Sequence, residues 1–514
     1  MVAHAPGKHG TRGGGLHEGF SESGLHTQIH NVAIKQHHFT ALAIRLMNML
    51  TFKPQVAFGG KYIWFYFLPA WLLCLVSLRI CLPHQVDHIV LTFLASAGAC
   101  FLWFVGLHSR LFPSRSTPEQ LVNSSTDRPS ASPALVAGIP CAALLILALV
   151  FFGGVRHDYK LYTSQWSYIN AGNIPWVLEA KNNYYFPLHS FLAPLAAVHP
   201  LLVKILFAGT ALFTFAISAF GHVVDNERTG SQEKFILFIS SVFCPYAIFV
   251  FFWLGLNDAV TSSLLLLATI LATAKPFQPR FQFLAGVLLA LGACIKVYPI
   301  VVAPFFFVRQ RKFQWPFLAG CLVALLAVFG LSFHMWGSAT FYPFMFASSR
   351  EGTFISPFNA LRHAGLNLDR FSTVAMASAL AASFSWYVRR NIDFPSAVLV
   401  GLGMTLFFYS GGNINYLAYV IYATPFMIRY WSANFNRETA SKLSLALLGW
   451  GAFLNWYQLQ LVLNCGMTLD TTSRVFRNHG GWINAIVILL AFSTFRTCLM
   501  KPDRHANPPT PSRL

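Results

Sequence analysis

Charged side chains are scarce in this sequence. They make up 10% of its 514 residues, whereas hydrophobic side chains make up 55% and aromatic ones 16%. An ordinary soluble domain carries about 25% charged residues. Water does not keep so apolar a chain dispersed, whereas a lipid bilayer does. The composition therefore excludes an ordinary soluble protein and predicts an integral membrane protein.

Acidic residues are scarcer than basic ones, with 17 Asp and Glu against 36 Lys and Arg. The basic residues form no dense patch with interleaved aromatic rings, so we expect no nucleic acid as a partner. They lie mostly in short loops between apolar runs, where the positive-inside rule places them. The nine cysteines lie mostly within apolar runs, at spacings that suit neither zinc nor a disulfide framework.

The sequence lacks a long apolar run before Tyr62, which argues against a signal peptide. Residues 1–59 are rich in Gly, His and Ser and predict a flexible cytosolic tail. Beyond this tail we expect two additional N-terminal spans with an inner loop at 60–133, the main transmembrane domain at 134–500 and a cytosolic tail at 501–514.

Apolar runs of about 15 to 23 residues recur along the rest of the chain. A helix needs about 20 residues to cross the hydrocarbon core of a membrane. The pattern predicts an all-α polytopic transmembrane bundle of about 12 spans, with long outer-face loops and both termini cytoplasmic. The runs cover residues 62–82, 88–108, 134–154, 200–222, 235–254, 257–274, 316–336, 371–388, 397–411, 416–431, 443–463 and 482–500.

The apolar run 283–308 differs from the others because both of its flanks are basic. It also contains Lys296, Pro299 and Pro304, which interrupt a helix. We expect a broken, re-entrant pair of half-length helices with Lys296-Val297-Tyr298-Pro299 at the turn. Non-helical backbone at membrane depth is tolerated only where it lines a cavity or is buried in protein.

Long loops lie on the outer face, at 155–199, 337–370 and 464–481, and long ordered loops tend to carry function. Asp158 lies a few residues after the span that ends near Gly154. A carboxylate at this depth suits a general base that takes a proton from a hydroxyl acceptor. The alternative is a solvated loop acid beside Arg156.

Two further groups on the outer side have a binding and a structural interpretation. Asn257 and Asp258 form a tight turn between spans, where Asp258 binds substrate, caps the following helix, or does both. The Lys296 ammonium costs about 2.5–3.5 kcal/mol within an apolar run. The ammonium either extends to the membrane interface or binds an anionic phosphate of the substrate. Tyr298 would shape the turn that presents it.

The remaining outer polar residues are individually weaker candidates. Arg350 suits bidentate binding of a phosphate, or it pairs with Glu351 or Asp369. Asn413, Asn415 and Tyr416 lie in a Gly-containing stretch that either binds sugar hydroxyls or only makes a turn.

Several motifs resemble those of a known enzyme class. They are Tyr185-Phe186-Pro187-Leu188 with Phe191 to Leu195, then Gly255 to Asp258, and Ala285-Gly286 through Lys296-Val297-Tyr298-Pro299. The chain resembles polyprenyl-phosphate-sugar-dependent glycosyltransferases of the GT-C class, in the bacterial mannosyl- and arabinofuranosyltransferase group that includes glycosyltransferase family 87. The resemblance runs from about residue 134 to about 431, and Phe186 replaces a proline of the pattern.

The resemblance implies a GT-C-like catalytic domain in the bacterial plasma (inner) membrane. It implies a polyprenyl-phosphate sugar donor, a glycolipid or glycan acceptor, surrounding membrane lipids, and an inverting single displacement without a cofactor or a metal. In this scheme Asp158 is the catalytic base, and Lys296 and Arg350 bind the donor phosphate. The expected substrate-binding residues are Asn257, Asp258, Tyr298, Glu351, Asn413, Asn415 and Tyr416.

Two alternatives stay open. A polysaccharide polymerase or ligase is favoured by Arg350, Arg362 and His363 in the loop 337–370. A lipid or sugar transporter (a flippase) would have charges at mid-depth in several spans and often an internal repeat. Here only Lys204, Lys296 and His334 lie in or near apolar runs, and no repeat is visible.

Overall fold

The computed structural model describes residues 100, 106–108, 111–112, 133–155, 158–176, 186–221, 231–309, 311–344, 356–390, 392–409, 414–464 and 472–499. The chain divides into two units, Met1–Pro83 and His84–Leu514, and all described residues belong to the second. The tail 1–59, the span 62–82, most of the span 88–108 and the tail 501–514 lie outside the described residues.

The described part of the chain is helical apart from its loops and one small hairpin. In this hairpin β1 (Val308–Arg309) pairs antiparallel with β2 (Lys312–Phe313). The helices are α5 (Pro133–Gly153), α6 (Asp158–Asn170), α7 (Pro187–Ser190), α8 (Ala193–Val198), α9 (Pro200–Phe220), α10 (Ser231–Val242), α11 (Asp258–Ala274), α12 (Pro279–Ala293), α13 (Ala303–Phe307), α14 (Trp315–Trp336), α16 (Pro357–His363), α17 (Ser372–Arg390), α18 (Phe394–Phe408), α19 (Ala418–Asn434), α20 (Arg437–Asn464) and α21 (Thr472–Leu499).

Several of these helices are long and apolar enough to cross a membrane. Among the described residues, three continuous helical stretches meet this test: Pro200–Phe220, Trp315–Phe344 and Asp369–Arg390. A fourth span results if Glu233–Val242 and Ala247–Trp253, which meet at a bend of 65°, count as one. The all-helical prediction is confirmed, whereas the count of about 12 spans is not, because helices such as α11 and α18 are shorter than a full span.

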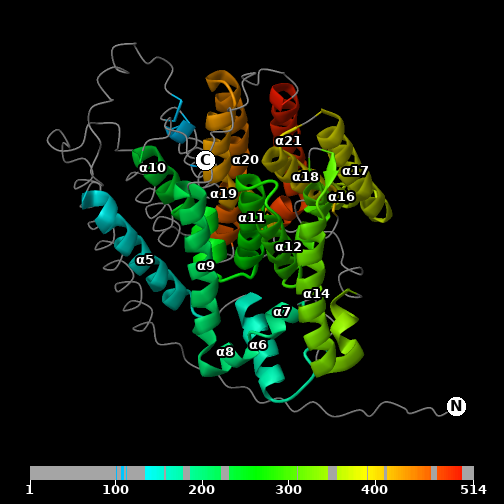
Figure 1. Cartoon of the computed structure of the whole chain (residues 1–514). Helices are drawn as coiled ribbons and strands as arrows, with labels where there is room; N and C mark the ends of the chain where they lie inside the picture. Colours follow the sequence, from blue (N-terminus) through cyan, green and yellow to red (C-terminus); the bar gives the residue numbers. More distant parts are fainter. Residues whose placement is uncertain are drawn as a thin grey trace, which may run out of the picture. The chain divides into compact units, whose positions relative to one another are not determined.

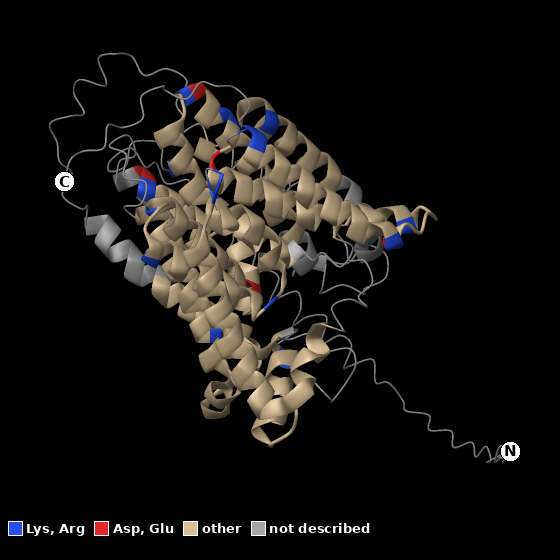
Figure 2. Ribbon diagram, turned by 45° about the vertical axis from the view of Figure 1, so that its right-hand side comes forward, with Lys and Arg blue, Asp and Glu red and all other residues tan. Residues whose placement is uncertain are grey.

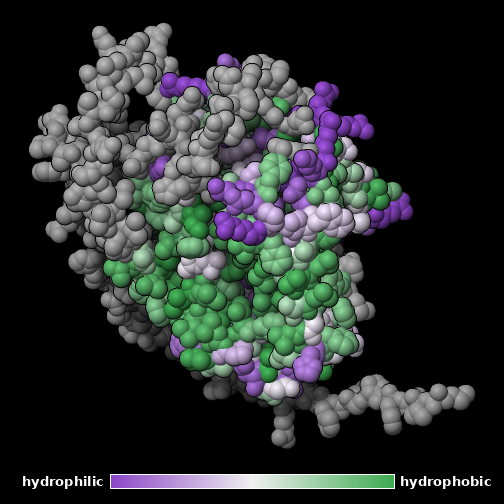
Figure 3. Space-filling model, in the orientation of Figure 1, coloured by the Kyte–Doolittle hydropathy of each residue, from purple (hydrophilic) through white to green (hydrophobic). Residues whose placement is uncertain are grey.

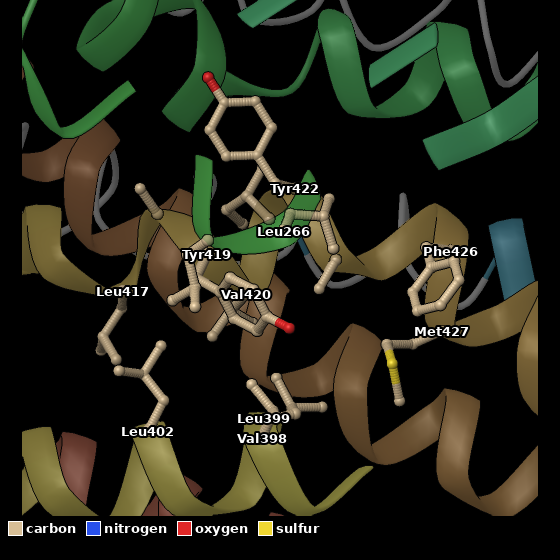
Figure 4. Packing of buried hydrophobic residues seen from close by; sticks show 14 of the residues in the cluster. Leu266, Val398, Leu399, Leu402, Leu417, Tyr419, Val420, Tyr422, Phe426 and Met427 are labelled. Atoms are coloured by element: carbon tan, nitrogen blue, oxygen red, sulfur yellow. The ribbon is translucent and has the colours of Figure 1, made fainter. Parts of the chain in front are cut away.

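The helices pack around α11 and α19 (Figure 1). α11 contacts α9, α12 and α19, and α12 packs along α14. Buried side chains of α11, α18 and α19, including Leu266, Leu399 and Tyr419, meet in the core (Figure 4). Figure 3 shows a broad apolar surface between two polar zones. Figure 2 shows Lys and Arg gathered mostly towards the upper end of the bundle, away from α6 and α8. This distribution fits a membrane protein with one basic face.

The chain reverses its direction after α12, where the sequence predicts a turn. Lys296 lies beside Asp258 at the first residue of α11. Arg309, only 13 residues later, donates a hydrogen bond to the carbonyl oxygen of Ala272 near the last residue of α11. The segment from Tyr298 to Phe307 therefore runs along α11 from its beginning towards its end, in the direction opposite to α12.

Two buried arginines stabilise the carboxyl ends of neighbouring helices. Arg309 contacts the end of α11, and its guanidinium lies 4.3 Å from the centroid of the Phe394 ring. Arg429 of α19 donates to the carbonyl oxygens of Ser218 (3.2 Å) and Gly221 (2.8 Å), at the end of α9. The last carbonyl groups of a helix have no partner within it, so a cation there satisfies them and complements the helix dipole.

Residues 187–198 form two short helices, α7 and α8, with a turn at Phe191 and Leu192 between them. Pro187 and Pro194 each lie in the first turn of one of these helices, where the missing N–H is tolerated.

α12 and α14 approach each other closely through glycine. A Cβ atom at Gly286 would clash with the carbonyl group of Phe317, and one at Gly320 would clash with that of Phe283. Small residues allow this backbone approach, which is a common basis of helix association in membranes.

We therefore expect Gly320→Ala to lower the free energy of unfolding by about 1–3 kcal/mol, because the added methyl group overpacks this contact. Gly330→Ala is the control, since it lies in the same helix with open space at its Cβ position. Thermal unfolding of the detergent-purified protein measures both variants. Equal melting temperatures for the two variants would contradict the close contact.

Candidate active site

The first part of the site is the turn that leads into α11. Gly255 has a φ of +66°, a conformation that glycine adopts without strain. Asn257 and Asp258 follow it and are fully buried. The residue preceding α11 is Asn257, which makes no side-chain cap bond, and Asp258 is the first helical residue. The alternative in which Asp258 caps the helix is therefore wrong, because its carboxylate is used elsewhere.

The Asp258 carboxylate forms an ion pair with Lys296, with 2.6 Å between Oδ2 and Nζ. The side chain of Asp258 is 1% exposed and that of Lys296 is 15% exposed. The ammonium also lies 5.2 Å from the centroid of the Tyr416 ring. The alternative in which Lys296 only extends to an interface does not describe this arrangement, because the ammonium is held by a buried carboxylate.

Tyrosine rings lie against this pair. The Tyr298 hydroxyl is 2.7 Å from the hydroxyl of Ser262, one helical turn after Asp258. The rings of Tyr298 and Tyr416 are stacked at 5.0 Å, and Tyr409 stacks on Tyr416 at 6.4 Å. Tyr298 is buried, whereas Tyr416 and Tyr409 are only partly buried, so the stack extends from the core towards more exposed side chains.

α6 and α7 lie against the other side of the turn. Tyr162 of α6 donates a hydrogen bond to Oδ1 of Asn257 (3.1 Å), and Trp166 donates to the carbonyl oxygen of His189 (2.9 Å). The N–H of Leu188 bonds to the carbonyl oxygen of Cys294 (3.1 Å), just before Lys296. α7 therefore connects α6 to the segment that carries Lys296.

Lys204 is a further anchor beside the site. It is fully buried on α9 and donates to the carbonyl oxygens of Gly154 (3.0 Å) and Trp253 (2.5 Å). These carbonyl groups precede Asp158 and the Asn257 turn, respectively. A Cβ atom at Gly255 would collide with the Lys204 stem, so the glycine makes room for the lysine.

His189 was not a candidate in the sequence analysis. Its ring is buried, stacks on Trp166 at 4.9 Å and meets the edge of Tyr162 at 4.7 Å. Burial, and then the positive charge of Lys296, lowers the pKa of His189 from 6.5 to about 3. His189 is therefore neutral at physiological pH.

The structure brings together five of the ten predicted site residues: Asn257, Asp258, Lys296, Tyr298 and Tyr416. Asn415 precedes Tyr416 in a 3₁₀ turn and is partly buried. Asp158 is the first residue of α6, but its side chain lies outside the described part. Arg350, Glu351 and Asn413 lie outside the described residues altogether. Sequence reasoning missed Tyr162 and His189 as site residues and noted Lys204 only as a lone charge in an apolar run.

Within the described ranges, no group of three or more His, Cys, Asp or Glu side chains is placed to hold a metal ion. Two buried polar atoms at the turn, Nδ2 of Asn257 and Oδ1 of Asp258, have no hydrogen-bond partner among the described residues. Buried polar atoms are costly when unpaired, and such exceptions are frequent at functional sites.

Comparison with protein families identifies the reaction class. Residues 187–408 match the model of glycosyltransferase family 87. The chain is a glycosyltransferase. The matched segment is somewhat less than half of the sequence and contains α7, the Asn257 turn and Lys296, but neither α6 nor Tyr416. No curated protein and no solved structure matches the chain.

The hydrogen bond from Tyr162 to Asn257 offers a test of how α6 is positioned in the glycosyltransferase. We expect Tyr162→Phe to reduce sugar transfer about fivefold, the equivalent of about 1 kcal/mol for one buried hydrogen bond. Tyr168→Phe, on the same helix and only partly buried, is the control. Initial rates in reconstituted membranes measure the effect, and a native rate for Tyr162→Phe would contradict this positioning role.

The lowered pKa of His189 predicts a pH dependence of stability. Between pH 6.5 and about 3 the unfolded chain binds a proton that the folded protein rejects. The contribution of His189 to the free energy of unfolding is complete above pH 6.5. Below pH 6.5 it decreases by up to about 1.4 kcal/mol per pH unit. We expect His189→Phe, which keeps a ring on Trp166, to melt with a weaker dependence on pH between 6.5 and 4.5.

The exposed His334 supplies the control for this experiment, as His334→Phe. Thermal unfolding across the pH series measures native protein and both variants. If the melting temperature of His189→Phe depends on pH as strongly as that of native protein, protonation of His189 does not destabilise the folded state.

Proposed function

We propose that this glycosyltransferase moves a sugar from a polyprenyl-phosphate donor to a lipid-linked glycan or polysaccharide acceptor on the outer face of a bacterial plasma membrane. In this proposal both termini are cytoplasmic. The observation that carries it is the Lys296 ammonium, which is partly exposed beside a stack of tyrosine rings at the end of a bundle of apolar helices. A membrane-embedded cation of this kind suits an anionic headgroup that is carried on a lipid.

The proposed reaction is a single displacement with inversion. The acceptor hydroxyl oxygen bonds to the anomeric carbon of the sugar while the bond from that carbon to the phosphate oxygen breaks. The hydroxyl proton passes to the carboxylate of Asp158, and the electron pair of the broken bond stays on the lipid phosphate. Lys296 and Arg350 stabilise the charge that develops there.

The position of α6 supports the assignment of Asp158 as base. Asp158 begins this helix one turn before Tyr162, and Tyr162 is hydrogen-bonded to Asn257 next to the ion pair. Lys204 fixes the carbonyl group of Gly154, at the entry to the same segment. These contacts hold the beginning of α6 near the proposed phosphate site.

The other candidate residues complete the proposed substrate site. Tyr416 and Tyr298 offer aromatic rings, which suit packing against a sugar ring. Amide and carboxylate groups suit hydrogen bonds with sugar hydroxyls. The proposed substrate-binding residues are Asn257, Tyr298, Glu351, Asn413, Asn415 and Tyr416, whereas Asp258 is the counter-ion of Lys296.

Sugar transfer in reconstituted membranes tests the proposal. The assay supplies a panel of polyprenyl-phosphate sugars and a glycolipid extract as acceptor. We expect Asp158→Asn to lower kcat about 100- to 10,000-fold, because proton removal is lost. Lys296→Met is expected to lower kcat/KM about 100-fold, because the leaving phosphate loses its cation.

Asp369→Asn is the matched control, since Asp369 forms a different ion pair, with Arg362 at 3.2 Å. It is expected to keep the native rate. Native-level activity in Asp158→Asn, with the same amount of folded protein, would require another base. Absence of transfer from every polyprenyl-phosphate sugar would overturn the donor assignment.

A further inference from the structure

The ion pair between Asp258 and Lys296 is asymmetric. The side chain of Lys296 is 15% exposed, whereas that of Asp258 is 1% exposed. Asn257 precedes Asp258 in the buried turn, and Ser262, one helical turn after Asp258, is hydrogen-bonded to the buried Tyr298. The ammonium is therefore more accessible to an approaching ligand than the carboxylate.

The proposed reaction changes the charge of the lipid phosphate. A polyprenyl-phosphate sugar is a phosphodiester with one negative charge. The product is a phosphate monoester, which carries about −1.5 to −2 at pH 7. A fixed cation therefore binds the product more strongly than the donor, and tight binding of the product slows its release.

We propose that Asp258 is a positioning residue that limits how strongly Lys296 holds the product. This inference rests on the proposed function. The carboxylate keeps the ammonium directed into the site and neutralises part of its field. Lys296 then stabilises the charge of the departing phosphate without retaining the polyprenyl phosphate afterwards. In this proposal Asp258 acts through Lys296 and does not contact the substrate, in contrast to the substrate-binding role that the sequence suggests.

Asp258→Asn tests this inference, because it removes the charge and keeps the shape. We expect the KM for the donor to fall about tenfold. The inhibition constant of a short-chain polyprenyl phosphate is expected to fall by about the square of that factor, since the product carries about twice the charge. Turnover is expected to slow and a burst of the first product to appear, as release becomes rate-limiting.

Two further variants separate charge from structure. Asp258→Glu keeps the charge, so the ratio of donor KM to product inhibition constant is expected to stay native even if kcat falls. Glu438→Gln breaks the exposed pair with Lys442 and is expected to change neither constant. If Asp258→Asn does not fold, the ratio in Asp258→Glu decides, and a changed ratio there overturns the inference.

Other results would also overturn it. A higher donor KM in Asp258→Asn would mean that the carboxylate contacts the donor, and equal changes in both constants would exclude the charge argument. Binding of the short-chain polyprenyl phosphate, measured by its quenching of tryptophan fluorescence, needs no turnover. If native protein transfers no sugar but Asp258→Asn still binds this lipid more tightly, only the proposed function fails.

Discussion

The buried ion pair between Asp258 and Lys296 links the beginning of α11 to the point where the chain reverses. Removing one partner of a buried pair leaves an uncompensated charge, which typically costs about 3–5 kcal/mol. At the other end of α11, Arg309 contacts the carbonyl group of Ala272. One cation thus fixes each end of the returning segment, and the turn at Lys296 to Pro299 has a defined position beside the proposed site.

The same constraint explains the other buried cations. In an apolar medium, backbone carbonyl groups at helix ends and turns need a donor from within the protein. Lys204 supplies one to Gly154 and Trp253, and Arg429 supplies one to Ser218 and Gly221. These charges lie at ends and breaks of helices, so they are anchors of the fold. Lys204 therefore gives no support to a transporter, because its charge satisfies backbone carbonyl groups of the fold. Arg362, a residue that favoured a polymerase, is bound to Asp369 and Asn359.

The sequence predicts helix positions well because each apolar run carries its own length and its own flanking signals. The runs 200–222 and 316–336 correspond to α9 and α14 within two residues, and basic flanks predict the reversal after α12. The sequence singles out Lys296 by its motif and the prolines that follow it, but it reveals the partner of neither Lys204 nor Lys296. Their partners, backbone carbonyl groups for one and a carboxylate for the other, lie some 40 to 50 residues away. Only the folded chain brings those partners together.

The division of the site between two parts of the chain has a chemical consequence. The segment that matches glycosyltransferase family 87 contains Lys296, which is proposed to bind the donor phosphate, and its counter-ion Asp258. The proposed base, Asp158, lies before this segment, on a helix joined to it through Tyr162 and Trp166. Donor activation and acceptor deprotonation thus depend on different elements. Transfer then requires that α6 and the ion pair keep a fixed separation, and the hydrogen bonds of Tyr162 and Lys204 impose that requirement on the fold.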